Sequence, residues 1–172
     1  MRKNPNESIK LEFNSARNEF QKLLNLLSDD DFRKKSHNPG WNNNEILFHM
    51  LFGFMIIIPL ISIIRFFGKK PKKYSAVFSK VLNSSTSLFN WINAIGARGG
   101  GMIFKRHALS YRFYKTIEAL NNKLDSVSEN ELKQGMYYPL KWDSLFAEYM
   151  TLEKLFRYPI AHFKFHKKQI RY

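Results

Sequence analysis

The sequence predicts an all-α fold, namely a four-helix bundle with a long crossover between its second and third helices. Apolar residues recur at alternating steps of three and four along several segments, which is the spacing of one helix face. No segment shows the strict two-residue alternation that is typical of a half-buried strand. The chain has 172 residues, of which 44% are hydrophobic, so it can bury one sizeable core. We therefore expect a single helical domain over residues 1–172.

The first two helices have the clearest signals. The first carries one apolar stripe, formed by Ile9, Phe13, Ala16, Phe20, Leu23 and Leu27. The acidic turn at 28–31 is expected to end it. The second helix is expected to begin after Asn42, which can cap it together with Glu45 at the third helical position. Pro59 is expected to kink this helix, which ends before Gly68.

Residues 68–104 form the predicted crossover between the second and third core helices. A short helix fits residues 79–95, and the glycine run at 99–101 is expected to end it. The apolar positions of that short helix are Val81, Leu82, Leu88, Phe89 and Ile92.

The third core helix is expected to end near Ser126, and its apolar face consists of Leu109, Phe113, Ile117, Leu120 and Leu124. Residues 135–140 are expected to form a loop. Asp143 or Ser144 is then expected to cap the last helix, which Pro159 interrupts. The apolar residues assigned to this last helix are Leu145, Tyr149, Leu152, Phe156, Phe163 and Ile170.

The charge of the chain is strongly positive, with 28 Lys and Arg against 14 Asp and Glu, a net charge of +14. Such a field attracts polyanions, including nucleic acid, anionic lipid and acidic small molecules. The basic residues are scattered, and no nucleic-acid motif accompanies their densest run at 68–73. We therefore expect no specific nucleic-acid partner, and we keep a weak contact with an anionic membrane surface as an open alternative.

Cysteine usage and the N-terminal residues bear on the compartment. The chain has no cysteine, which excludes disulfides, thiolate metal ligands and a cysteine nucleophile. The first residues lack the apolar core of a secretory signal, so a cytoplasmic protein is expected. The alternative is a membrane-associated helical protein anchored through residues 46–64, an uncharged stretch that basic residues follow. Residues that interrupt this stretch argue against insertion: His49, Gly53, Pro59 and Ser62.

Three histidines form the candidate metal site. His162 and His166 lie four residues apart on the last helix, so both imidazoles can reach one ion. His49 lies on the most hydrophobic helix, where a buried imidazole needs a polar partner. The competing interpretation is a hydrogen-bonded core residue at His49 and two solvent-facing histidines near the C-terminus. Gly53 follows His49 by one turn, and it either leaves room beside an ion or allows a close contact between helices.

Three pieces of the sequence, in this order, resemble the DinB/YfiT superfamily. An acidic turn at 26–32 ends an early amphipathic helix. Residues 41–49, Trp-Asn-Asn-Asn-Glu-Ile-Leu-Phe-His, are similar to the family's W-[ST]-x-x-E-x-x-x-H helix opening, with Asn42 in place of Ser or Thr. Residues 162–170 are similar to its H-x-x-x-H-x-x-Q-I ending. The sequence departs from the family in its very apolar second helix, in Pro159 near the histidine pair and in the crossover.

This resemblance implies a four-helix bundle that holds one divalent metal ion on His49, His162 and His166, with zinc or nickel as the expected ion. Family members include metal-dependent thiol transferases and proteins described as hydrolases. The resemblance therefore implies a transferase or hydrolase with a small-molecule substrate, for which a thiol is one candidate, and a homodimer is one open assembly. Three protein ligands would leave coordination positions for water or substrate, as in catalytic zinc sites.

Several functional points stay open at the level of the sequence. A metal-binding protein without catalysis is an alternative, because no residue is identifiable as a general base. Glu45 and Glu148 are candidates for supporting groups near the ion, although Glu45 also fits a simple capping role. His37 and His107 are expected to be exposed to solvent and to take no part in the site.

Overall fold

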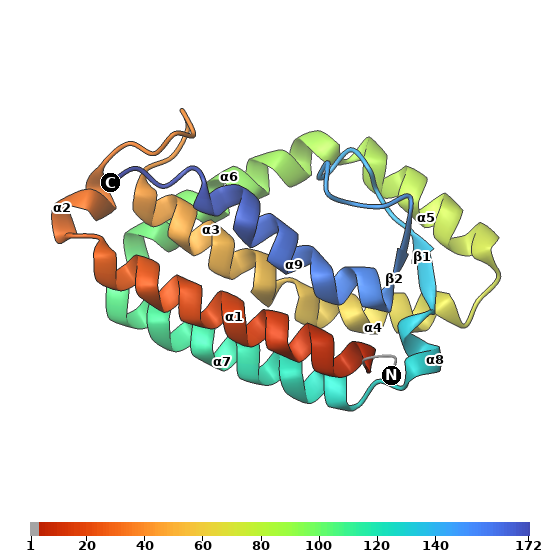
Figure 1. Cartoon of the computed structure of the whole chain (residues 1–172). Coiled ribbons are helices and arrows are strands. Elements are labelled where there is room, and N and C mark those ends of the chain that lie inside the picture. The colour runs from red at the N-terminus through yellow and green to blue at the C-terminus, as the bar shows by residue number, and fades with distance from the viewer. Residues whose placement is uncertain (1–3) are drawn as a thin grey trace.

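The computed structural model describes residues 4–172, and long helices dominate it (Figure 1). Its core consists of α1 (Pro5–Leu26), α3 (Asn43–Met55) with its continuation α4 (Ile57–Gly68), α7 (Arg106–Asp125) and α9 (Leu152–Lys167). Helix α1 packs against α7 and α9, and α3 packs against the same two helices. Helices α1 and α9 run in one direction and α3 and α7 in the other (Figure 1). The all-α expectation is confirmed.

Large aromatic side chains from all four core segments meet at the centre of the bundle. The ring centroids of Phe20 on α1 and Phe113 on α7 lie 4.2 Å apart, and those of Phe113 and Phe54 on α3 lie 4.9 Å apart. Phe163 on α9 contacts the same cluster. Aromatic pairs of this kind add about 0.5–1.5 kcal/mol each beyond the burial of their area. The cluster therefore fixes α3 against α9, the two helices that carry the histidines.

The second predicted helix is divided at Ile56, where α3 ends and α4 begins. The expected kink at Pro59 is therefore confirmed, but it lies slightly upstream of the proline. A proline ring clashes with the carbonyl group four residues before it, and here that carbonyl belongs to Met55. The break at Ile56 follows directly from this geometry.

Among residues 4–172, the segment Asn43–Gly68 is long and apolar enough to cross a membrane by length and composition, and its most apolar 18-residue window has a mean hydropathy of 2.5. In the fold, 56% of its most apolar window is buried. Ile46, Met50, Phe54 and Ile57 are fully buried in the hydrophobic core. This segment thus supplies the central helix of the bundle, a position that favours apolar residues on all sides.

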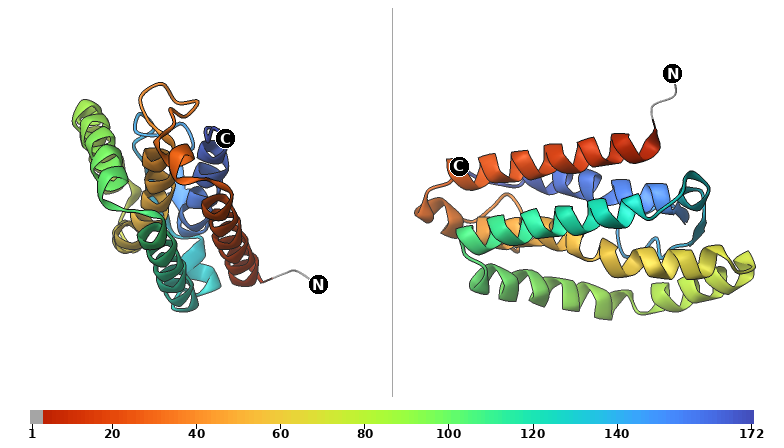
Figure 2. Two further views of the ribbon diagram at one scale, coloured as in Figure 1. Left: turned by 90° about the vertical axis from the view of Figure 1, so that its left-hand side faces the viewer. Right: turned by 90° about the horizontal axis from the view of Figure 1, so that it is seen from below.

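The crossover contains two helices, α5 (Lys72–Ser84) and α6 (Thr86–Ile103), which run along the outer side of the bundle (Figure 2). The expectation of one short helix ended by the glycine run at 99–101 is wrong, because α6 continues through it. Gly100 and Gly101 are buried against α3, and a Cβ atom at Gly100 would overlap the ring of Phe48. The glycines here allow two helices to approach closely, which compensates for their low helix propensity.

The region before the last helix also differs from the expectation. Strand β1 (Gly135–Tyr137) pairs with β2 (Tyr149–Thr151) in antiparallel register, with Met136 opposite Met150. Strand β1 replaces part of the expected loop at 135–140, and β2 replaces part of the expected last helix, to which Leu145 and Tyr149 had been assigned. Three residues are too few to show an alternating pattern. Helix α9 begins at Leu152, and its cap is Thr151 rather than Asp143 or Ser144.

Two short helices complete the connections, α2 (Asp29–Arg33) after α1 and α8 (Glu129–Leu132) after α7. Each begins with a capping box, formed by Ser28 with Asp31 and by Ser128 with Glu131. In α9, the interruption expected at Pro159 does not end the helix, which continues to Lys167. The histidine pair therefore stays on one helix face.

Candidate metal centre

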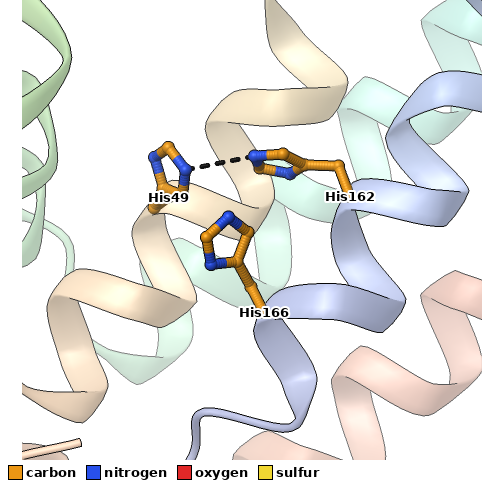
Figure 3. A group of neighbouring side chains, drawn as sticks. All are labelled: His49, His162 and His166. Carbon is orange, nitrogen blue, oxygen red and sulfur yellow. Dashed lines mark hydrogen bonds between the residues drawn. The ribbon is translucent and has the colours of Figure 1, made fainter. Parts of the chain in front are cut away.

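The structure brings the three predicted histidines together between α3 and α9, and Figure 3 shows their rings turned toward one another. His49 lies in the middle of α3, and His162 and His166 lie one turn apart on α9. One nitrogen from each ring lies within 4.8 Å of the other two. All three side chains are buried, with exposed fractions of 6%, 4% and 8%. A three-histidine group of this geometry can bind a metal ion.

The closest approach in the group joins the Nε2 atoms of His49 and His162, which lie 3.1 Å apart (dashed line in Figure 3). Because the two Nε2 atoms face each other at hydrogen-bonding distance, they can share a proton or face a common cation. His166 closes the third side, with its ring centroid 4.5 Å from that of His49 and 4.4 Å from that of His162.

The tautomer of His166 is fixed by a hydrogen bond. Its Nδ1–H donates to Oε1 of Gln169 over 2.9 Å, which leaves the lone pair of Nε2 directed at the other two rings. The Trp41 ring lies 4.6 Å from the His49 ring and 6.3 Å from the His166 ring, measured between centroids. A hydrogen bond such as the one from His166 to Gln169 orients metal-binding histidines in proteins.

Burial keeps the histidines neutral. It lowers the pKa of His49 to about 3, and the neighbouring charge of His166 adds to the effect. Burial also lowers the pKa of His162 well below its ordinary value, with His49 and His166 as further causes. The pKa of His166 is lowered by burial as well, against the opposing effect of Gln169. At neutral pH the three imidazoles are therefore in the form that binds metal ions.

Two features set the distance between α3 and α9 at this point. A Cβ atom at Gly53 would lie only 2.6 Å from Nδ1 of His162, so glycine allows the imidazole to lie directly against α3. The fully buried Asn43 joins the start of α3 to the chain after α9, since its amide donates to the carbonyl of Arg171 and accepts from the N–H of Arg171. Of the two roles left open for Gly53, the close contact is confirmed.

The family assignment comes from the sequence model of the DinB superfamily, which matches residues 12–170. The chain belongs to the DinB superfamily. The match includes both helices that carry the histidines, and it also includes the crossover α5–α6, which resembles none of the family's motifs quoted above. Comparison with the curated proteins and with the solved structures gives no match.

A cavity of about 350 Å3 adjoins two of the histidines in this DinB-superfamily chain. His49 and His162 form part of its wall, and its other polar groups include Asp143 and the tyrosines at 138 and 158. The hydroxyl of Tyr158 donates to Oδ2 of Asp143 over 2.6 Å. The Tyr138 hydroxyl is buried without a hydrogen-bond partner among the described residues. The volume lies within the range of about 300–1,000 Å3 that is typical of small-molecule sites.

The other predicted site residues lie elsewhere. Glu45 caps α3, where its carboxylate accepts from the N–H of Asn42, and neither Glu45 nor Glu148 belongs to the histidine group. His37 and His107 are exposed, as expected. Sequence reasoning missed the Asp143–Tyr158 pair, because Asp143 was assigned to a helix cap. Only the folding of the loop 138–148 back onto α9 brings these two residues together.

Proposed function

We propose that this protein binds one divalent metal ion through the Nε2 atoms of His49, His162 and His166, and that it acts on a small molecule bound in the adjoining cavity. One observation carries the proposal, namely the convergence of three buried, neutral imidazoles beside a cavity of substrate size. Zinc and nickel are the preferred ions, because both accept imidazole ligands readily.

The number of ligands favours a catalytic role over a structural one. Structural zinc sites are usually closed by four protein ligands, whereas catalytic sites use three and keep a position for water or substrate. Among residues 4–172, the group contains the three histidines and no carboxylate. A bound ion would supply a water of pKa about 7 or hold a substrate thiol as its thiolate. Either chemistry suits a metal-dependent thiol transferase or a hydrolase.

The residues around the cavity have separate tasks in this proposal. Burial raises the pKa of Tyr138, so its hydroxyl stays protonated and can donate a hydrogen bond to a substrate oxygen or sulfur. Burial and the negative charge of Asp143 raise the pKa of Tyr158, which keeps the Tyr158–Asp143 hydrogen bond in place. The apolar remainder of the wall excludes water from the bound substrate.

Metal analysis tests this function directly. Untagged protein purified without chelator should contain one zinc or nickel ion per chain by plasma mass spectrometry. The variants His49→Ala, His162→Ala and His166→Ala should each lose stoichiometric metal, because two imidazoles leave the ion undercoordinated. His37→Ala and His107→Ala are the matched controls, since both residues are exposed, and they should keep the metal.

Two outcomes would contradict the proposal in different ways. Wild-type protein without metal, or a triple histidine variant that retains it, would remove the metal site. Protein that binds the ion but neither transfers a thiol nor hydrolyses esters or amides in a screen would support the alternative of a metal-binding protein without catalysis. The observation that favours this alternative is that Asp143, the one carboxylate among the described residues that line the cavity, already accepts a hydrogen bond from Tyr158.

A further inference from the structure

The cavity beside the histidines has an elongated, apolar wall. Lining residues on α3 and α4 recur on one face from His49 to Ile63, a path of about 20 Å at 1.5 Å per residue. No lining residue precedes His49 on α3 or follows His162 on α9, so the histidines mark one end of the cavity. The apolar side chains along the path are Phe52, Ile56, Leu60 and Ile63.

The opposite wall comes from the crossover and from the loop after β1. Helices α5 and α6 contribute Phe78, Leu82, Phe89 and Ile92. The loop contributes Trp142, whose ring stacks on Phe89 with centroids 4.2 Å apart and whose indole N–H donates to the carbonyl of Leu82 over 2.8 Å. Trp142 therefore joins the loop to both crossover helices and completes the apolar wall.

We propose that this cavity binds an amphiphile with an acyl or alkyl chain. The alkyl chain of the ligand lies along α3–α4 toward Ile63, and the polar head group faces His49 and His162 at the end of the cavity that these residues mark. The apolar wall sets the class of the chain, and the buried polar groups set the position of the head group. The contact of the head group with a metal ion rests on the proposed function. The binding of the acyl or alkyl chain in the apolar part of the cavity does not depend on that function.

Binding of the alkyl chain of an amphiphile to the cavity can be measured by fluorescence titration with dansyl-undecanoic acid, with dodecanoate and dodecanol as competitors. Wild-type protein treated with chelator should bind one probe per chain, and both competitors should displace it. Ile92→Trp should weaken probe binding about tenfold, because the larger ring narrows the cavity. Ile95→Trp is the matched control, since Ile95 is a similarly exposed isoleucine on α6 that does not line the cavity, and it should bind as wild type.

The outcomes separate this inference from the metal site. Probe binding by metal-free protein supports the amphiphile site even if metal analysis fails, and metal binding without saturable probe binding overturns it. Equal weakening by Ile92→Trp and Ile95→Trp would also overturn it, because the probe would then bind to the surface of α6. Both variants change exposed positions, and circular dichroism should show unchanged helix content.

A second, independent observation concerns the side of α5 and α6 that faces away from the bundle. Large apolar side chains lie there with exposed fractions of 46–75%. We call them the outer face, which consists of Tyr74, Val77, Val81, Leu88, Trp91, Ile95, Met102 and Ile103. Spacings of three, four and seven residues place those from Tyr74 to Val81 along one side of α5 and those from Leu88 to Met102 along one side of α6, with Ile103 next to Met102 at the end of the helix. Exposed apolar residues that gather on one side of a helix mark interaction sites.

The charges around the outer face indicate its partner. Residues 66–105 include seven Lys and Arg residues and no Asp or Glu. All seven are exposed, and none forms an ion pair in the part of the chain that the structure describes. These residues are Lys69, Lys70, Lys72, Lys73, Lys80, Arg98 and Lys105. Amphipathic helices with apolar residues on one side and basic residues beside them bind the interface of anionic bilayers.

We infer that the outer face docks on an anionic membrane surface, with α5 and α6 lying in the plane of the interface. This mode differs from a spanning helix, because the segment Asn43–Gly68 stays in the core of the bundle. Vesicles of phosphatidylglycerol and phosphatidylcholine should co-sediment the protein at low salt, whereas vesicles of phosphatidylcholine alone should bind at least tenfold less. High salt should reduce binding, because it screens exposed charges.

Glutamate substitutions at two equally exposed apolar residues, one on the outer face and one outside it, test which surface binds the vesicles. Trp91→Glu should weaken vesicle binding about tenfold or more, whereas Leu11→Glu should have little effect. Trp91 and Leu11 are 62% and 64% exposed, but Leu11 lies on α1. Equal loss in both variants, or no binding by the wild type, would overturn the inference. A concentration-dependent dimer that Trp91→Glu dissociates, without vesicle binding, would assign the outer face to a second copy of the chain and overturn it as well.

Discussion

The core helices α3 and α9 and the crossover helices α5 and α6 use the same residue periodicity in opposite ways. Helices α3 and α9 bury their large side chains and hold the histidines between them. In α5 the buried residues are Ser75 and Ser79, and in α6 they are Ala97, Gly100 and Gly101. The crossover therefore contacts the bundle through small residues, and its large apolar residues face solvent or the cavity. Hydrophobic periodicity thus predicts a helix but not the side that it buries.

The two pairs of helices also begin differently. Helix α3 has a capping box of Asn42 and Glu45, and α9 has Thr151, whose hydroxyl accepts from the N–H of Lys154. Neither α5 nor α6 has a side-chain cap. Side-chain caps therefore support the starts of the two site-bearing helices, whereas the crossover helices depend more on their contacts with the bundle.

The largest expected effect compares a core ring with a crossover ring. Phe113→Ala should lower the free energy of unfolding by about 3–5 kcal/mol, because it leaves a cavity in the aromatic cluster. Trp91→Ala should change it by less than about 0.5 kcal/mol, since Trp91 is 62% exposed. Urea unfolding followed by circular dichroism measures both. A large loss at Trp91 would show that the outer face is covered within the folded protein.

Acid should lower the free energy of unfolding through the three buried histidines. Burial lowers the pKa values of the three histidines in the folded chain, that of His49 to about 3, whereas the ordinary value near 6.5 applies after unfolding. The unfolded chain therefore binds more protons below pH 6.5, and the free energy of unfolding should fall as the pH falls from 6.5 toward 3. Urea titrations of chelator-treated protein across this range test the slope.

Histidine variants identify the source of that slope. His162→Phe should flatten the decline, because phenylalanine carries no proton. His37→Ala should leave the profile unchanged, since His37 is exposed. A profile that stays flat between pH 6.5 and 4 in the wild type would contradict the burial of the three rings.

Gln169 tests how its hydrogen bond supports the site. Gln169→Ala should lower metal affinity by about 10–100-fold, which is the usual cost of removing a partner that orients a metal-binding histidine. The readout is competition with a chromogenic zinc chelator. Gln21→Ala is the matched control, because Gln21 is an exposed glutamine on α1 whose side chain bonds, among residues 4–172, only to Asn25 and to Ser110 on α7. Unchanged affinity in Gln169→Ala would exclude a role in orienting His166.

The smallest expected effect concerns the helix starts. Asn42→Ala should cost about 1 kcal/mol of stability, because it removes an N-terminal cap. Ser85→Ala, at the start of α6, should cost less than Asn42→Ala, since the Ser85 side chain caps no N–H of that helix and its hydroxyl donates to the carbonyl of Leu82. Equal costs for the two variants would contradict the difference in capping between core and crossover.

The candidate site was more predictable than the chain that surrounds its cavity. His162 and His166 share one helix turn and His49 follows a recognisable helix start, so local pattern made them candidates, and the resemblance to the DinB/YfiT superfamily joined the three in one site. The hairpin of β1 and β2 and the true start of α9 were not predicted, because three-residue strands have no detectable period. Because Asp143 was assigned to the cap of the last helix, the hydrogen bond between Asp143 and Tyr158 was not predicted either.

The sequence by itself determined the helical class and the capped start of α3, because these depend on spacing and on local hydrogen bonds, and it singled out the three histidines as candidates. Only the tertiary structure decided that the glycine run at 99–101 continues a helix, that Gly53 admits the ring of His162 and that the crossover closes a cavity. These outcomes depend on which surfaces meet, and residues far apart in the sequence supply the two surfaces. The spacing of apolar residues along one segment does not indicate which other segment packs against it.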